Sequence, residues 1–284
     1  MKRRNNLTVL GLLAPMLIGL AVFFFVPFII LIRYTFTETV GGHEFVGLRN
    51  YVAIMKSNAF KTALLNTGKF LVIGVVLIMV LSFLLALMIQ KKFAGSKLLR
   101  SVILFPMFLP VAAVVTIVTV FFSDAGLVNN ALTALGISAK EWLTGPAAFP
   151  LVLGIYIVKN IGFDVILFLA GLNMIPKELY ESAEMEGAGA FRRVFDITLP
   201  LITPTTFFVF IISVMNCFKS FREVFVLGGE YPDKSIYMLP HFINNNISNL
   251  NYQRLAVASV IVFLIIAIIT GVFYVLESRS EERL

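Results

Sequence analysis

The chain is poor in charged residues, cysteine and histidine, which soluble enzymes and metal-binding proteins commonly use. Only 14% of its 284 residues are charged, and it contains one cysteine and two histidines. The single cysteine, Cys217, excludes an intrachain disulfide, and no Cys/His spacing typical of a metal site is present. Hydrophobic residues make up 59% of the chain, more than a soluble globular domain usually contains. The composition therefore indicates a membrane protein.

Six blocks are long and apolar enough to cross a bilayer as helices, which takes about 20 mostly apolar residues. They cover about Val9–Ile32, Leu65–Ile89, Leu98–Phe122, Phe149–Leu172, Leu199–Phe218 and Leu255–Leu276. The first block exceeds the apolar part of a signal peptide, roughly 7–15 residues, so we expect it to be retained as a helix. The sequence thus predicts an all-α polytopic membrane protein with six transmembrane helices, forming one domain over residues 1–284.

Lysine and arginine are concentrated in the segments that six spans place on one side of the membrane. That side and the adjoining span ends carry about twelve of them, and the opposite side carries about seven in longer segments. The twelve are Lys2, Arg3, Arg4, Lys91, Lys92, Lys97, Arg100, Lys177, Arg192, Arg193, Arg279 and Arg283. Because basic residues favour the cytoplasmic side, we expect a cell-membrane protein with both termini in the cytoplasm. The positive charge is interpreted as an orientation signal and not as a nucleic-acid surface.

The sequence lacks the motifs of common enzymes. It has no GxxxxGK[ST] phosphate loop, no HExxH and no GxSxG, so we expect no ATP, metal or other cofactor on this chain. His43 and His241 fall in expected outer loops and are interpreted as solvated residues. Asp164 is the only acid clearly within an expected span. These absences favour transport or assembly over catalysis.

The polar segment Glu181–Pro200, ESAEMEGAGAFRRVFDITLP, separates the fourth and fifth apolar blocks on the expected cytoplasmic side. Lys177–Met185 contains residues that favour a helix, and Gly187 interrupts it because glycine readily adopts positive φ. A second short helix is expected at Ala190–Ile197. The pattern predicts a helix–glycine turn–helix loop over about residues 173–198 that lies off the membrane. Its first helix is amphipathic and suits docking into a groove of another protein.

This stretch resembles the coupling loop of ABC importer permeases, whose pattern is Glu-Ala-Ala, two residues, Asp-Gly-Ala, then Phe and Leu-Pro. The residues that match at this spacing are Glu181, Ala183, Gly187, Ala188, Phe195, Leu199 and Pro200. Ser182 and Glu186 replace the alanine and the aspartate of the pattern. Ala170–Ala183 and Phe45–Tyr51 are similar to the carbohydrate-uptake, MalF-like branch, whereas Leu227–Ser235 departs from it. The resemblance implies contacts to an ATPase subunit from Glu181, Ala183, Glu184, Glu186, Gly187, Ala188 and Phe195.

The resemblance implies a permease subunit of an ATP-driven importer that forms half of the path for a sugar or oligosaccharide. It implies a second permease subunit, two ATPase subunits that hold ATP and Mg, an external solute-binding protein and the surrounding membrane lipid. Alternatives stay open: a glycerol-phosphate-type solute, a self-sufficient secondary transporter or a membrane protein that does not transport. No arginine lies in the expected path, which favours sugars over phosphate compounds.

Polar side chains inside the expected spans predict where this path runs, because polar groups exposed to lipid are unfavourable. Asn160 and Asp164 lie four residues apart and share one helix face. The fifth span and its outer end carry Ser213, Asn216 and Ser220. A path lined by hydroxyls and amides suits neutral, hydroxyl-rich solutes; the alternative is that these groups bond one helix to another. Lys159 points about 100° away from the Asn160 face and is interpreted as the partner of an acid in another chain.

The predicted topology can be tested by labelling introduced cysteines with a membrane-impermeant thiol reagent. A cysteine at Ser182 should react only from the cytoplasm, and one at Ser235 only from outside, because the spans are even in number and the basic residues lie on one side. The measurement compares intact cells with inverted vesicles. Labelling of both positions from the same side would rule out this topology.

Overall fold

The computed structural model describes residues 12–39, 41–42, 44–91 and 95–281, which form helices and loops without an extended sheet. Candidate membrane spans are Leu12–Thr35, Asn58–Gln90, Val111–Ala134, Gly145–Met174 and Tyr252–Val275. A sixth results if the bent pair Ala190–Leu201 and Thr203–Gly228 counts as one span. The all-α, multi-span fold class is therefore confirmed. The start of the first block at Val9 and the basic residues Lys2, Arg3, Arg4, Lys92 and Arg283 lie outside the described residues.

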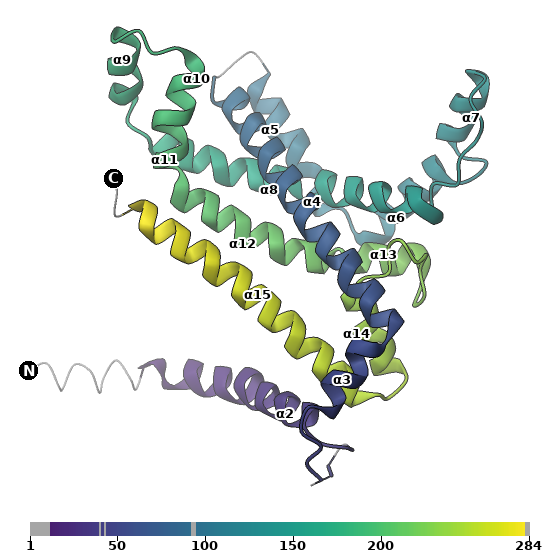
Figure 1. The fold of residues 1–284 in the computed structure, drawn as a ribbon. Helices are drawn as coiled ribbons and strands as arrows, with labels where there is room; N and C mark the ends of the chain where they lie inside the picture. Colours follow the sequence, from purple (N-terminus) through teal and green to yellow (C-terminus); the bar gives the residue numbers. More distant parts are fainter. Residues whose placement is uncertain (1–11, 40, 43, 92–94, 282–284) are drawn as a thin grey trace, which may run out of the picture. The chain divides into compact units, whose positions relative to one another are not determined.

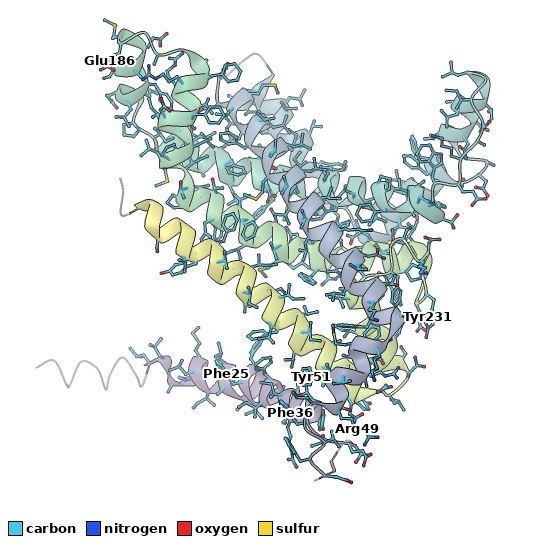
Figure 2. The ribbon with its side chains drawn as sticks, viewed as in Figure 1. Phe25, Phe36, Arg49, Tyr51, Glu186 and Tyr231 are labelled. Atoms are coloured by element: carbon cyan, nitrogen blue, oxygen red, sulfur yellow. The ribbon has the colours of Figure 1, made fainter. Side chains whose placement is uncertain are left out.

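The chain divides into two compact units, and the prediction of a single domain over residues 1–284 is not tested by this division. One unit comprises residues 1–61 and 242–265 and includes η1 (Ala21–Phe25), α2 (Val26–Thr35) and α3 (Arg49–Lys56). The Asn50 side-chain amide donates to the carbonyls of Thr35 and Thr37, at 3.0 Å each, and fixes α3 to the end of α2. Figure 2 labels Phe36 and Tyr51, whose rings lie 5.8 Å apart in this unit.

The other unit, residues 62–241 and 266–284, is organised around α8 (Ala148–Met174). α8 packs against α12 (Thr203–Lys219), which runs beside it in Figure 1, and against α5 (Ser96–Leu104). The helices come close where α8 has no side chain. A Cβ on Gly162 would lie 2.2 Å from the carbonyl oxygen of Ile103, and a Cβ on Gly171 would lie 2.4 Å from Thr205 Oγ1. Small residues commonly allow such approaches between membrane helices.

The third apolar block, expected as one span over Leu98–Phe122, is divided in the structure. α5 ends at Leu104, a short 3₁₀ turn η2 (Phe105–Phe108) follows, and α6 (Val111–Phe122) begins after Pro110. Proline lacks the N–H that would continue the helix and clashes with the preceding turn. After the break, α6 packs against α13 (Phe221–Gly228), whereas α5 and η2 pack against α8. The candidate span then continues from α6 through α7 (Leu127–Ala134).

The segment after the fifth block is largely helical. It contains α13 and α14 (Leu239–Ser248), and α15 (Tyr252–Glu281) follows. Asn66 of α4 (Asn58–Gln90) donates to the carbonyls of Lys234 and Tyr237, at 2.8 and 3.0 Å, and holds this segment against α4. His241, expected to be solvated, is fully buried, and burial lowers its pKa to about 4. His43 lies outside the described residues.

The close approach at Gly162 predicts a specific packing defect. Gly162→Ala should destabilise the protein by about 1–3 kcal/mol, because its methyl group would meet the backbone of α5 and force the helices apart. Gly154→Ala is the matched control on the same helix, since a Cβ there meets nothing within 4 Å. Thermal unfolding of both purified variants measures the difference. Equal melting temperatures would contradict the packing described at Gly162.

Candidate functional site

The loop between α8 and α12 is a helix–turn–helix with a well-defined turn. α9 covers Lys177–Met185, the range expected from the sequence, and Gly187 adopts φ +82°. The Ala188 N–H donates to the carbonyl of Ala183 at 2.8 Å, and the Gly187 N–H donates to that of Glu184 at 3.0 Å. This pair of bonds is a Schellman motif, which satisfies the last carbonyls of a helix and requires a left-handed residue. The turn therefore depends on Gly187.

The second arm of the loop is braced against the first. α10 (Ala190–Arg193) continues into the π-helical turn η4 (Val194–Thr198), where one continuous helix over Ala190–Ile197 was expected. The Arg193 guanidinium donates to Glu184 Oε2 at 2.8 Å, and the Tyr180 and Thr198 hydroxyls lie 2.9 Å apart. The ion pair is partly exposed, so it contributes at most about 1 kcal/mol, but together with the Tyr180–Thr198 contact it links the two arms.

Large apolar side chains near this turn are exposed to solvent. Met185 is 89% exposed, Phe191 84% and Phe195 62%. Figure 1 shows α9 and α10 projecting beyond the end of α8, and Figure 2 shows Glu186 at the outer edge of that projection. An exposed apolar cluster rimmed by charged residues commonly marks a surface that binds a partner. We call this surface, formed by Leu179, Ala183, Met185, Glu186, Ala188, Phe191 and Phe195, the loop face.

The residues expected to contact an ATPase lie together on this loop. Glu181, Glu184 and Glu186 are exposed, and Ala183 and Ala188 are half-buried and joined by the turn's hydrogen bond. Phe195 belongs to η4, and its ring is exposed. The sequence analysis counted Arg193 only as an orientation signal and did not single out Phe191. The Phe-Arg-Arg run that follows Gly-Ala-Gly-Ala would have been the available signal. The contact of the loop residues with an ATPase stays a prediction.

The residues expected to line the solute path divide into two groups. Asp164 and Ser213 are both fully buried, and the Ser213 hydroxyl donates to Asp164 Oδ2 at 2.9 Å. The Tyr156 hydroxyl donates to the Ser213 carbonyl at 2.9 Å, so this group joins α8 to α12 inside the chain. Asp164 Oδ1 has no hydrogen-bond partner among the described residues. This placement suits helix association, the alternative that the sequence left open.

Of the other three path residues, Asn160 and Ser220 use their side chains for bonds within the local helix turn. Asn160 donates to the Tyr156 carbonyl at 2.8 Å, and the Ser220 hydroxyl donates to the Asn216 carbonyl at 3.2 Å. Asn160 and Asn216 are half-buried, whereas Ser220 is buried. None of the hydrogen bonds found among the described residues joins Asn160, Asn216 or Ser220 to Asp164. Their contact with a solute stays a prediction.

Lys159 has a partner within the chain, which corrects the expectation of an acid from another chain. Its ammonium pairs with Glu223 Oε1 of α13, and both side chains are largely buried. The sequence analysis ended the fifth span at Phe218 and so placed Glu223 in an outer loop. The helix in fact resumes at Phe221 after Ser220 and carries Glu223 inward.

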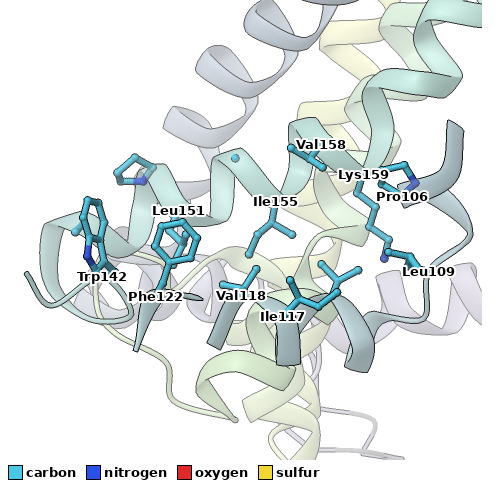
Figure 3. A pocket seen from close by; sticks show the side chains of 14 residues that line it. Pro106, Leu109, Ile117, Val118, Phe122, Trp142, Leu151, Ile155, Val158 and Lys159 are labelled. Carbon is cyan, nitrogen blue, oxygen red and sulfur yellow. The ribbon is translucent and has the colours of Figure 1, made fainter. Parts of the chain in front are cut away.

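A cavity of about 490 Å³ lies between α6 and α8, beside this ion pair. Trp142 and Phe122 line one end of it, and Lys159, Pro106 and Leu109 line the other, as Figure 3 shows. Among the described residues that line the cavity, Lys159 carries the only charge. The separation of α6 from α8 follows from the break at η2, which directs α6 toward α13.

Comparisons with known proteins agree with this architecture. Residues 78–282 match the family described as "Binding-protein-dependent transport system inner membrane component". The chain is 31% identical to the arabinooligosaccharides transport system permease protein AraP of Bacillus subtilis, over 75% of this chain and 70% of that protein. It is 31% identical to the sn-glycerol-3-phosphate transport system permease protein UgpA of Agrobacterium fabrum, over 92% of this chain and 91% of that protein.

A third relative and a solved structure extend the comparison. The trehalose/maltose transport system permease protein MalF of Thermococcus litoralis is 33% identical over 66% of this chain and 64% of its own length. The structure of a bacterial ABC transporter involved in the import of the acidic polysaccharide alginate contains a chain with the same fold. Its TM-score is 0.84 at 24% identity, covering 97% of this chain and 96% of that chain.

The protein is thus a multi-pass membrane permease and belongs to the family of binding-protein-dependent transport system inner membrane components. Its relatives are permease subunits of sugar and related ABC importers, so the expected family is confirmed. Membership of this family makes the chain a transport subunit and not an enzyme.

The buried contact between α8 and α12 gives a testable expectation. Ser213→Ala should lower stability by about 1–3 kcal/mol, because it leaves the buried Asp164 carboxyl without its hydrogen bond. Ser220→Ala is the matched control on α12's end, since its hydroxyl bonds only within its own helix turn. Unfolding of the purified variants in mixed micelles measures both. If Ser213→Ala matches Ser220→Ala in stability, the Ser213–Asp164 bond does not hold these helices together.

Proposed function

We propose that this chain is one of two permease subunits in an ATP-driven importer and forms half of the path for a sugar or oligosaccharide. It would pair with a second permease, with two ATPase subunits in the cytoplasm and with an external solute-binding protein. One solved relative in fold is an alginate transporter in complex with a pentasaccharide-bound periplasmic protein, which supports the last partner. ATP and Mg belong to the ATPase subunits in this proposal, and both termini of the chain lie in the cytoplasm.

The loop face is the observation that carries this proposal. It presents exposed apolar side chains on a turn held by a Schellman motif and by the Glu184–Arg193 ion pair. An amphipathic helix of this kind suits a groove in a partner, with Met185, Phe191 and Phe195 as its apolar anchors. Glu181 and Glu186 would accept hydrogen bonds from the ATPase at the rim of that groove.

The loop is built to transmit movement from the ATPase to the membrane helices. α10 and η4 lead without a break into α11 (Leu199–Leu201), and α12 begins at Thr203. α12 packs along α8 through the Asp164–Ser213 bond and the approach at Gly171. Closure of the ATPase dimer would therefore move α9, and the braced turn would pass that movement to α12 and α8. A flexible loop could not do so.

A saccharide is the solute class that the described path supports best. Among the candidate path residues, Asn160 and Asn216 supply amides and Ser220 supplies a hydroxyl, and Lys159 of α8 is paired with Glu223. Relatives named for arabinooligosaccharides and for trehalose and maltose agree with this choice. The relative named for sn-glycerol-3-phosphate keeps a phosphate compound as the second candidate, which a transport assay with both solutes decides.

Substitutions in the loop test the docking proposal. Gly187→Val should cost about 1–3 kcal/mol of local strain, because valine disfavours φ +82°. Glu181→Lys should weaken association by about 2–5 kcal/mol if it reverses the charge at a desolvated contact. Both variants should reach the membrane yet lose the ATPase subunit in a pull-down, or lose ATP turnover stimulated by the loaded binding protein.

A matched control is available for the glycine. Gly136 also has positive φ, +75°, and open space around its Cβ position, but it lies after α7 and outside the loop. Gly136→Val carries a similar backbone strain and should leave ATPase recovery and stimulated turnover unchanged. Normal recovery and turnover in both Gly187→Val and Glu181→Lys would mean that Glu181–Pro200 is only a solvated loop.

A further inference from the structure

The cavity between α6 and α8 extends along a helix that is long and apolar enough to span the membrane. Its lining residues on α8 run from Pro150 to Lys159, a length of about 14 Å at the helical rise of ~1.5 Å per residue. This is close to the ~15 Å depth of one leaflet, half of the ~30 Å hydrocarbon core of a bilayer. Ile117 and Val158 line the cavity in Figure 3 and are 50% and 58% exposed, so the cavity is open at the surface of its unit.

The walls of the cavity offer little to a polar guest. Apart from Lys159, the described side chains that line it are aliphatic or aromatic, and the Lys159 ammonium is paired with Glu223. The indole N–H of Trp142 is also engaged, because it donates to Asn129 Oδ1 at 3.0 Å. An ordered water needs about two to four polar partners, which these walls do not supply. The cavity therefore suits a hydrocarbon guest.

The volume of the cavity favours a single hydrocarbon chain over a helix of a partner subunit. A helix with its side chains is about 10 Å wide, so a 14 Å length of it would fill roughly 1,100 Å³. The cavity measures about 490 Å³, less than half of that volume. Because the cavity lies along a membrane-spanning segment, the acyl chains of the bilayer are the hydrocarbon that surrounds it.

One end of the cavity carries groups that suit the headgroup layer. Trp142 lies three residues before a candidate span, and tryptophan is enriched at membrane interfaces. The exposed Lys140 places its ammonium 5.8 Å from the centre of the Trp142 ring. Lys140 holds the loop through its main chain, since its N–H and carbonyl both bond to the Asn129 side chain. The acidic neighbour Glu141 accepts a hydrogen bond from Thr144 at 3.1 Å. The Lys140 side chain can thus reach a phosphate at this end of the cavity.

We propose that the cavity binds one acyl chain of a phospholipid from the leaflet that adjoins Trp142, with the lipid phosphate beside Lys140. The break at η2 directs α6 toward α13, so the lipid chain completes the contact between α6 and α8. An anionic phospholipid should bind about fivefold better than a zwitterionic one, the usual effect of one basic residue near a membrane surface. This site goes beyond the proposed function, because it requires only that the chain spans a membrane.

Photo-crosslinking with phospholipids that carry a diazirine on one acyl chain tests this site. The full chain is reconstituted into vesicles of phosphatidylcholine and phosphatidylglycerol, alone and together with the other subunits of its importer. Mass spectrometry then measures adducts on Val118 and Ile155, which line the cavity. Val72 and Val76 of α4, which are 68% and 57% exposed, give the reference for lipid that merely surrounds the chain.

Filling the cavity should remove the bound chain. Gly154→Phe adds a ring to the cavity wall, since Gly154 lines the cavity and a Cβ there meets nothing within 4 Å. Adducts on Val118 and Ile155 should fall at least about fivefold relative to Val72 and Val76, because a ring and an acyl chain cannot share this space. Gly154→Ala is the matched control and should leave the adducts unchanged. Equal adducts in the original chain and in Gly154→Phe would overturn the proposal.

A second variant keeps the test independent of how Gly154→Phe folds. Lys140→Gln leaves the main-chain bonds to Asn129 in place and removes only the charge. It should abolish the roughly fivefold preference for the phosphatidylglycerol probe over the phosphatidylcholine probe at Val118 and Ile155. Absence of this preference in the original chain would overturn the proposal. Adducts that form on the chain alone but not in the assembled importer would also overturn it, because a partner subunit would then fill the cavity.

Discussion

The close packing of α8 against its neighbours is the constraint on which the larger unit of this structure depends. In a bilayer, apolar side chains gain little by leaving lipid, so helices associate through tight contact and buried hydrogen bonds. Gly162 brings α8 against the backbone of α5, Gly171 brings it against Thr205 of α12, and Asp164 accepts a hydrogen bond from Ser213. The loop and the cavity both take their positions from this helix.

The loop face and the cavity lie toward opposite ends of α8. α8 leads into α9 at one end, and its other half lines the cavity with Gly154 and Lys159. α12 and α13 also connect the two regions. The loop elements η4 and α11 lead into α12, and Glu223 of the following α13 pairs with Lys159. A displacement of the loop would therefore be transmitted to the cavity through the packed helices and the Lys159–Glu223 ion pair.

Local features of the sequence predicted much of this structure. The apolar blocks, the helix Lys177–Met185 and the left-handed turn at Gly187 follow from composition and from glycine's backbone freedom, which do not depend on distant residues. The break at Pro106 and Pro110 was readable in principle, because proline interrupts helices, but the apolar run concealed it.

Contacts between distant residues could not be predicted in this way. No periodicity pairs Lys159 with Glu223 or Asp164 with Ser213, because each pair joins different helices. The burial of His241 likewise depends on neighbours such as Phe221, whose ring lies 4.7 Å away. The polar face on α8 and α12 was recognised from spacing, but only packing decides which of its members bond one helix to another.

Amide hydrogen exchange of the chain with and without its ATPase subunits tests the central claim most directly. If the loop face docks into the ATPase, amides over residues 177–195 should exchange at least about tenfold more slowly in the assembled importer, because the contact restrains the openings that permit exchange. Amides in the exposed loop at residues 135–141 should be unaffected. Equal exchange over residues 177–195 in both samples, with protection elsewhere on the chain, would contradict the account.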